Sequence, residues 1–364
     1  MADKKHITLV AGGTGGHMMP AEAVSRELVA RGYTVDLITD KRGDAYENIM
    51  RSLPRTVLKT GHMSSVGILG KMQLAINLMK SYRQCKQLMR QKRPDVVVGF
   101  GGYPSVPAMK AAFSLKIPTV LHEQNAVLGR SNRLLLKKCD ALALSFKPTR
   151  RLKEIYQHKA HHTGNPIRKE VVAVGLRPYP VPKADAPIHL LVIGGSQGAR
   201  ILSDVVPQSI SLLPSALKAR LVVTHQARPE DVERVKDIYA KAKISAKVAP
   251  FFEDMAQEFT LAHLVISRAG ASSVTEIISA ARPAIYIPLL SATDDHQTAN
   301  AKTVTQEKAG WLLPENTLTM ESLADTLQTI IADNALLATV SKKAVSQAKP
   351  DADKALADLI TAQC

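Results

Sequence analysis

The chain has 364 residues, of which 45% are hydrophobic and 22% charged, with three cysteines and a formal net charge of +16. These fractions exclude a disordered or low-complexity chain, and the length favours two domains. Cys85, Cys139 and Cys364 lie far apart without metal-ligand spacing, which argues against a disulfide framework or a zinc ribbon. No apolar run reaches the roughly 18 residues of a membrane span, and the run at 7–11 is too short for a signal peptide. We therefore expect a soluble protein of a reducing cytoplasm.

The excess positive charge lies in the first half of the chain. Residues 1–170 carry 29 Lys and Arg against 12 Asp and Glu, whereas the remainder has a net charge of −1. A basic surface attracts polyanions such as nucleic acid or anionic lipid headgroups. Nucleic-acid readers interleave aromatic with basic residues, and only 4% of this chain is aromatic. The charge pattern therefore favours a membrane surface over nucleic acid, with a simply solvated basic face as the alternative.

The predicted elements repeat along the chain. An apolar run at 7–11, a glycine-rich turn at 12–17 and a helical pattern at 20–30 recur as 189–193, 194–198 and 199–213. Four prolines between 178 and 187 mark a linker. Further buried strands are predicted over 35–38, 96–98, 119–121, 142–144, 221–223, 264–266 and 284–287, and helices over 22–31, 272–281 and 321–332. This alternation predicts two doubly wound α/β domains facing a central cleft, with ligands at the carboxyl ends of the strands.

Glycine-rich turns follow three of the predicted strands, at 12–17, 99–103 and 194–199. Such turns let backbone N–H groups approach a phosphate. The dinucleotide fingerprint fails because position 18 is Met, and no turn carries the Gly-Lys-Ser/Thr of a P-loop. NAD binding and P-loop ATP hydrolysis are therefore not expected, and a tight turn without a ligand is the structural alternative.

Two polar segments also follow predicted strands. His122–Asn125 comes directly after 119–121, and 268–276 comes after 264–266 with Glu276 in the early turns of a helix. A carboxylate suits the vicinal hydroxyls of a ribose, whereas a carboxylate that only complements the helix dipole is the competing interpretation. For His122–Asn125 the competing interpretation is a buried hydrogen-bonded turn.

Seven motifs occur in order along the chain. They are Gly12–His17, Gly101–Ser105, His122–Asn125, Gly164–Arg168, Gly194–Arg200, Arg268–Ala271 with Glu276, and Asp295–Gln297 with Asn300–Ala301. On these motifs the chain resembles, nearly end to end, the MurG family of peptidoglycan N-acetylglucosaminyltransferases in glycosyltransferase family 28. The resemblance implies a GT-B fold of two Rossmann-like domains. Residues 1–165 would form an acceptor- and membrane-facing domain, 166–187 a linker and 188–344 the UDP-GlcNAc-binding domain, with a C-terminal helix over about 345–364 packing back on the first domain.

The resemblance also implies an activity. It is the inverting transfer of GlcNAc from UDP-GlcNAc to the MurNAc C4 hydroxyl of lipid I, undecaprenyl-diphosphate-MurNAc-pentapeptide, which forms lipid II. The enzyme would act peripherally at the cytoplasmic face of the bacterial inner membrane, in cell-wall biogenesis, cell shape and cell division. Its partners would be UDP-GlcNAc, lipid I, an anionic membrane surface and other proteins of wall synthesis and division, without nucleic acid.

Site residues are carried over by position. The donor would contact Thr14, Gly15, Gly16, Asn125, Arg168, Ser196, Phe252, Ala271, Ser272, Ser273, Val274, Thr275, Glu276 and Gln297. Glu276 would bind the ribose, Phe252 would read uracil through its main chain, and Arg168 and Ser196 match donor and diphosphate contacts. The acceptor and its diphosphate are expected at Gly101, Gly102 and Tyr103. Departures from the family pattern at Met18, Met19, Val106, Ser272 and Ser273 bear on local packing and acceptor fit.

An inverting transfer needs a base for the acceptor hydroxyl and stabilisation of the departing diphosphate. His17, whose ordinary pKa of about 6.5 suits proton transfer at neutral pH, and Glu123, which would need a pKa raised by burial, are the two candidate bases. An alternative for His17 is a hydrogen bond to phosphate or sugar. No metal site is expected in the protein, because the only Asp-x-Asp, at 351–353, is far from the strand-end motifs. Stimulation by Mg²⁺ bound to the substrate diphosphates is compatible with this.

An apolar stripe at helical spacing is predicted to contact the membrane. Its residues are Ile68, Leu69, Met72, Ala75, Ile76, Met79 and Tyr82, with Lys71, Lys80 and Arg83 beside them. The alternative is a helix packed on its own sheet. Other functions considered are a diacylglycerol glycosyltransferase or a UDP-sugar epimerase of the same fold and, least favoured, a non-enzymatic nucleic-acid-binding protein.

Overall fold

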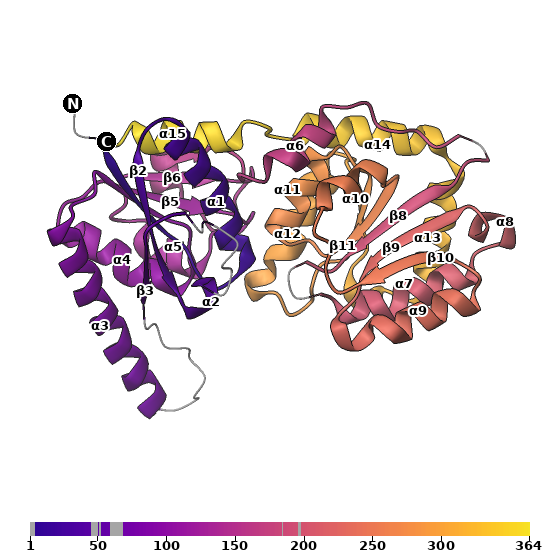
Figure 1. The fold of residues 1–364 in the computed structure, drawn as a ribbon, viewed down its shortest axis with the longest axis horizontal. Helices are drawn as coiled ribbons and strands as arrows, with labels where there is room; N and C mark the ends of the chain where they lie inside the picture. Colours follow the sequence, from indigo (N-terminus) through magenta and orange to yellow (C-terminus); the bar gives the residue numbers. More distant parts are fainter. Residues whose placement is uncertain (1–3, 45–49, 51, 59–67, 184, 196–197) are drawn as a thin grey trace. The chain divides into compact units, whose positions relative to one another are not determined.

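The computed structural model describes residues 4–364 except 45–49, 51, 59–67, 184 and 196–197, and only the backbone of 68–71. The chain forms two compact units (Figure 1). Unit 1 comprises Met1–Ile167 and Asp351–Cys364, and unit 2 comprises Arg168–Pro350. No helix in the described part of the chain combines the length and apolarity that a membrane span requires.

Unit 1 is built on a parallel sheet in the order β3-β2-β1-β4-β5-β6-β7. The strands are β1 His6–Val10, β2 Thr34–Asp40, β3 Arg55–Leu58, β4 Val96–Gly99, β5 Thr119–Glu123, β6 Ala141–Leu144 and β7 Ala160–His162. The helices are α1 Gly15–Ala30, α2 Lys41–Asp44, α3 Ile68–Gln91, α4 Gly102–Ser114, α5 Arg130–Leu135, the 3₁₀ helix η1 Glu154–Lys159, and α15 Ala352–Thr361. The strand order reverses between β1 and β4, which is the point where doubly wound folds bind ligands.

Unit 2 repeats this plan with the order β10-β9-β8-β11-β12-β13. The strands are β8 Ile188–Ile193, β9 Leu221–Gln226, β10 Ser245–Ala249, β11 Leu264–Ser267, β12 Ala284–Tyr286 and β13 Trp311–Leu312. The helices are α6 Lys169–Gly175, α7 Arg200–Leu212, α8 Ser215–Lys218, α9 Val232–Lys241, α10 Met255–Leu261, α11 Ala271–Ser279, α12 His296–Thr305, α13 Met320–Ala332 and α14 Asn334–Gln347. Short 3₁₀ helices are η2 Pro229–Asp231, η3 Thr293–Asp295 and η4 Glu315–Thr317. The prediction of two doubly wound α/β domains is confirmed for each unit by itself.

Apolar residues fill both faces of the unit 1 sheet because its strands are buried on both sides. Ile7 and Leu9 of β1 pack with α1 and α15, whereas Val10 packs with α3 and α4 on the opposite face. This period of two is that of a strand whose successive side chains point to opposite faces. Because both faces of the sheet are buried, successive residues of a strand are mostly apolar, and the sequence shows continuous apolar runs.

Two boundaries differ from those predicted. The expected linker over 166–187 is not a separate segment, because residues from Arg168 onward belong to unit 2 and include α6. The prolines that suggested a linker all follow this helix. The C-terminal helix begins at Ala352 and not near 345, since α14 runs to Gln347 in unit 2 and α15 belongs to unit 1.

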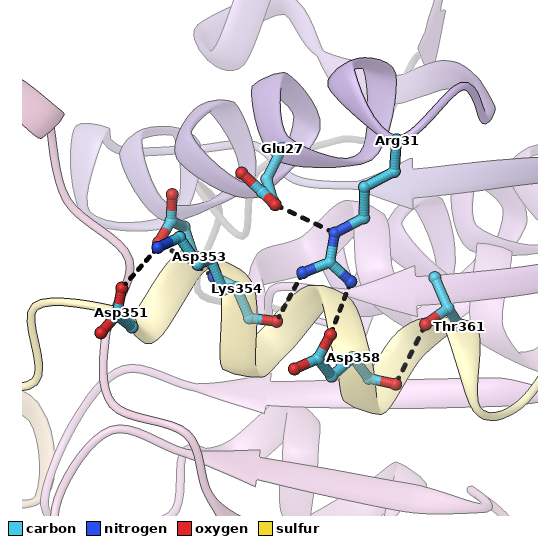
Figure 2. A network of polar contacts seen from close by, with 7 residues as sticks. All are labelled: Glu27, Arg31, Asp351, Asp353, Lys354, Asp358 and Thr361. Atoms are coloured by element: carbon cyan, nitrogen blue, oxygen red, sulfur yellow. Dashed lines mark hydrogen bonds and ion pairs between the residues drawn. The ribbon is translucent and has the colours of Figure 1, made fainter.

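The helix α15 packs along α1 (Figure 2). Leu356, Ala357 and Ile360 are fully buried and join the core shared by β1 and α1. Arg31 links the two helices at the surface, with Nη1–H donating to Asp358 Oδ1 at 2.6 Å. Asp358 is 69% exposed, so solvent screens this ion pair and it contributes little. The apolar face of α15 therefore carries most of the attachment.

We expect Leu356→Ala to destabilise unit 1 by about 2–5 kcal/mol, because a fully buried leucine leaves a cavity when it is truncated. Trp311, the single tryptophan, lies in β13 of unit 2. In urea unfolding, the change should move the transition seen by far-UV circular dichroism and leave the tryptophan fluorescence transition in place. Leu134→Ala, at a leucine 61% exposed in unit 1, is the matched control. Equal shifts of both signals would contradict the assignment of α15 to unit 1.

Candidate active site

The first group of candidate residues lies at the carboxyl edge of the unit 1 sheet. Strands β1, β4 and β5 are parallel neighbours, so the segments that follow them meet at one edge. His17 lies in the first turn of α1, Gly101 and Gly102 join β4 to α4, and Glu123 is the last residue of β5. The structure thus brings together predicted residues that are 106 positions apart at their extremes, His17 and Glu123.

His17 is held by the turn that precedes it. Its Nδ1 lies 3.1 Å from the carbonyl oxygen of Gly12 and 3.3 Å from Thr14 Oγ1. A carbonyl oxygen only accepts hydrogen bonds, so a neutral His17 carries its proton on Nδ1. The lone pair of the ring is then on Nε2, which gives His17 the tautomer of a general base.

The glycines after β4 make room for this imidazole. Gly101 and Gly102 have φ angles of 87° and 76°, a region that side-chain-bearing residues rarely adopt. A Cβ on Gly101 would lie 3.3 Å from His17 Nε2, and one on Gly102 would lie 3.1 Å from the Gly12 carbonyl oxygen. Tyr103, the third predicted acceptor residue, follows in α4 and is 38% exposed.

Glu123 has a different character from His17. Its side chain is buried, and its carboxylate accepts four hydrogen bonds. Oε1 accepts from the backbone N–H and the side-chain amide of Asn125, at 3.0 and 3.3 Å. Oε2 accepts from the Gly129 N–H at 2.7 Å and from Asn132 Nδ2 at 2.8 Å. Burial raises the pKa of Glu123 although these bonds oppose the shift, and the arrangement is that of a carboxylate organising its own loop.

The turn at 12–16 has a partner that the sequence did not reveal. Asp40, at the end of β2, is 3% exposed, and its Oδ1 accepts from the N–H groups of Gly13 and Gly43 at 2.9 and 2.8 Å. A Cβ on Gly12 would lie 2.8 Å from the same oxygen. Asp40 therefore fixes the turn in which Thr14, Gly15 and Gly16 lie.

The second group of candidate residues lies in unit 2, around the start of α11. The predicted segment Ala271–Glu276 forms the first turns of that helix, directly after β11. Glu276 is buried, and its Oε1 accepts from Arg168 Nε and Nη2 at 3.1 and 2.8 Å. Burial raises the pKa of Glu276, and the charge and hydrogen bonds of Arg168 oppose that shift. Two residues 108 positions apart, which the sequence suggested as separate contacts, are thus one ion pair.

Three polar side chains hold the turn before α11. Gln297 Oε1 accepts from the N–H groups of Ala269 and Leu289 at 3.2 and 3.0 Å, which leaves the amide nitrogen as the group that can donate to a ligand. Asn300 Nδ2 donates to the Ala269 carbonyl at 3.1 Å. Arg268, 8% exposed, donates to Glu315 at 2.9 and 3.2 Å.

Glu315 is a second residue that sequence reasoning missed. It also accepts from the Leu290 N–H at 2.9 Å. Burial alone would raise the pKa of Glu315, but the hydrogen bonds from Arg268 and Leu290 outweigh burial and lower it. No local motif marks Glu315 or Asp40, because each becomes a partner only through the fold.

Two further predicted donor residues remain. Phe252 follows β10 and is 5% exposed, with Lys247 Nζ 5.0 Å from its ring centroid. This burial is compatible with a role through the main chain. Ser196 lies outside the described residues, and of its turn only Gly194, Gly195, Gly198 and Ala199 are described.

Comparisons with known proteins match both halves of the chain. The glycosyltransferase family 28 N-terminal domain matches residues 7–144, and the C-terminal domain of the same family matches residues 189–356. The chain belongs to glycosyltransferase family 28. It is an enzyme of that family, and its fold class is the predicted GT-B.

Individual members of family 28 are similar over nearly the whole chain. The UDP-N-acetylglucosamine–N-acetylmuramyl-(pentapeptide) pyrophosphoryl-undecaprenol N-acetylglucosamine transferase of Rhodospirillum centenum is 42% identical, covering 97% of this chain and 93% of the relative. The protein of the same name from Rhodospirillum rubrum is 44% identical, covering 98% and 92%. The crystal structure of Acinetobacter baumannii MurG has a TM-score of 0.81 at 31% identity, covering 98% of this chain and 99% of that one.

We expect Gly101→Ala to lower the turnover of the transferase by up to about 100-fold, the cost of a misplacement of about 1 Å in an active site, because the added Cβ would lie 3.3 Å from Nε2 of the candidate base His17. Gly32→Ala is the matched control. Gly32 has nearly the same φ, +90° against +87°, but no atom lies within 4 Å of an added Cβ. Both variants carry similar backbone strain, so steady-state kinetics should separate them. Similar turnover in the two variants would contradict the steric link to His17.

Proposed function

We propose that this chain transfers GlcNAc from UDP-GlcNAc to the C4 hydroxyl of the MurNAc residue of lipid I, undecaprenyl-diphosphate-MurNAc-pentapeptide, with inversion at the sugar, and so forms lipid II. The observation that carries the proposal is the pairing of family membership with the two residue groups described above. Relatives that carry this activity in their names are more than 40% identical over nearly the whole chain. In this assignment unit 2 holds the donor and unit 1 supplies the base.

His17 is the proposed base. Its Nδ1 is bonded to the Gly12 carbonyl, so Nε2 can take the proton of the acceptor hydroxyl. Glu123 is disfavoured because both of its oxygens already accept two hydrogen bonds each. The proton accepted by His17 matches the one lost by the sugar hydroxyl as its oxygen bonds to the anomeric carbon, while UDP leaves with the electron pair of the broken bond.

Departing diphosphate needs positive charge or N–H donors. Backbone N–H groups of the described turn residues Gly194 and Gly195 are the proposed donors, with a positive φ angle of 78° at Gly195. The N–H of Gly198 donates to the Gly195 carbonyl oxygen at 3.0 Å and closes the turn. The proposal includes no metal ion held by the protein. Asp351 and Asp353 lie at the start of α15 in unit 1, where both contact Lys354.

A direct assay tests the reaction. The enzyme is given labelled UDP-GlcNAc with a polyprenyl-diphosphate-MurNAc-pentapeptide acceptor, and label is expected to move into the lipid phase only when both are present. Label transferred to diacylglycerol, or epimerised GlcNAc formed without any acceptor, would support the other enzymes of this fold and contradict the proposal. Tight RNA binding with a steep salt dependence and no transfer would do the same.

We expect His17→Ala to lower kcat by about 10²- to 10⁴-fold with little change in the KM for UDP-GlcNAc, since a base acts only in the transition state. Glu123→Gln should instead lower the melting temperature, because an NH₂ group would face two N–H donors whichever oxygen it replaces. Steady-state kinetics and thermal unfolding of both variants check this. A stable Glu123→Gln enzyme with the larger loss of kcat would contradict the assignment.

We further propose that unit 1 binds the anionic cytoplasmic face of the inner membrane through α3. Met72, Ile76 and Met79 are 57%, 46% and 52% exposed, although they form an apolar stripe. The opposite face of the same helix is buried through Cys85 and Met89. Helix periodicity puts exposed Arg83 on the apolar stripe's side, one turn beyond Met79.

The exposure of Met72, Ile76 and Met79 supports the membrane proposal over the alternative in which the apolar residues of this half of α3 pack on the sheet. Figure 1 shows the N-terminal half of α3 extending beyond the sheet of unit 1. Lys80 is exposed beside the stripe. The side chains of Ile68, Leu69 and Lys71, which were predicted to join it, lie outside the described residues.

We expect Arg83→Gln to weaken binding to vesicles containing phosphatidylglycerol by about fivefold, the effect of about 1 kcal/mol per basic residue at an anionic surface. Binding should also weaken as salt rises. Arg177→Gln, at an exposed arginine of unit 2, is the matched control. Flotation or co-sedimentation measures the bound fraction, and salt-insensitive binding to neutral phosphatidylcholine vesicles would contradict the electrostatic part.

A further inference from the structure

The ion pair between Arg168 and Glu276 is arranged in an unusual way. Both donors of Arg168, Nε–H and Nη2–H, point to the single oxygen Oε1 of Glu276. No described residue donates a hydrogen bond to Oε2. The Glu276 side chain is 9% exposed and that of Arg168 is 31% exposed. Solvent therefore screens this ion pair only partly, and its energy depends on the hydrogen-bond geometry. One carboxylate oxygen is thus fixed by the protein and the other is left for a ligand.

We propose that Arg168 is a positioning residue for Glu276: it holds the carboxylate so that Oε2 accepts the vicinal hydroxyls of the donor's ribose, and it does not itself bind the diphosphate. The inference rests on the proposed function, because it requires a uridine nucleotide as the donor. An ionised carboxylate oxygen has two lone pairs, which is enough for two hydroxyl groups. Arg168 therefore contributes to donor affinity through the ribose.

The packing of two helices fixes this pair. Arg168 is the N-cap of α6, and α6 packs against α11, which carries Glu276. Gly175, the last residue of α6, lies so close to α11 that a Cβ there would overlap the carbonyl oxygen of Ser279. Only a glycine permits this backbone contact. A side chain at 175 would push α6 away from α11 and carry Arg168 away from Glu276.

Charge supports the same role. Burial raises the pKa of Glu276, and Arg168 is the one cause that opposes the rise. A protonated carboxyl group loses acceptor capacity, so donor affinity should fall as the pH drops through the pKa of Glu276. Removing Arg168 raises that pKa further, which moves the fall in affinity to a higher pH.

Calorimetric titration of the full chain with UDP and with 2′,3′-dideoxy-UDP separates the two roles of Arg168. We expect Arg168→Gln to lower the affinity for UDP by about tenfold, which is the effect of losing one hydrogen bond to a charged group. The affinity for dideoxy-UDP should change by less than about twofold. Arg177→Gln should leave both unchanged. An equal loss on both ligands would show that Arg168 acts on the diphosphate and overturn the inference. Failure of the unchanged protein to bind UDP would instead overturn the proposed function.

Two further variants guard against a merely structural effect. Gly175→Ala leaves the charges in place and should lower the affinity for UDP without lowering the affinity for dideoxy-UDP. The fluorescence emission of Trp311 reports whether unit 2 is folded in this variant. The pH at which UDP affinity falls should move upward in Arg168→Gln and vanish in Glu276→Gln. An unchanged pH profile in Arg168→Gln, or a Gly175→Ala protein that is folded and binds UDP normally, would contradict the inference.

Discussion

Parallel strand pairing is the constraint on which the rest of this molecule depends. Every pair in both sheets is parallel, so each connection must return from the carboxyl end of one strand to the amino end of the next. The segments that leave neighbouring strands therefore gather at one edge. The turn at 12–17, the glycines after β4 and the end of β5 meet in unit 1 for this reason. In unit 2 the same rule brings together the start of α11 and the residues that follow β12.

At these edges, glycines, which have no side chain, are as important as the residues whose side chains carry the function. Gly101 and Gly102 let the segment after β4 approach the His17 ring, Gly12 leaves room for the Asp40 carboxylate, and Gly175 lets α6 lie against α11. Close backbone contact defines a position more sharply than long side chains, which can rotate away. The charged groups of the site are therefore placed by packing, and the hydrogen bonds that Asp40 and Glu315 accept and that Arg168 donates then select their orientation.

The sequence predicts the centre of each sheet and not its edges. All nine strands expected from apolar runs are present, whereas the strands that were not expected are β3, β7, β10 and β13, the two outermost strands of each sheet. An edge strand pairs on one side and is less buried, so it lacks a continuous apolar run. In β10, for example, the first three residues of Ser245–Ala249 are exposed or half-buried.

A similar limit applies to the site. The positions of residues that follow strands could be predicted from the spacing of the apolar runs, and the resemblance to the family assigned roles to these residues. Residue type could not show that the Glu123 carboxylate accepts hydrogen bonds from its own loop, and this is what favours His17 in the proposal. The pairing of Arg168 with Glu276 was equally hidden, since two residues 108 positions apart meet only after α6 packs on α11. The role of each of these residues depends on its burial and its hydrogen bonds, which residue type alone does not predict.

The position of α15 has a consequence for how the protein is made. Leu356, Ala357 and Ile360 complete the core of unit 1, although all of unit 2 precedes them in the chain. A growing chain therefore contains all of unit 2 before the first unit has its final helix. On the ribosome, unit 1 can complete its core only after unit 2 has been synthesised, and until then its α1 face exposes an apolar surface where a chaperone can bind.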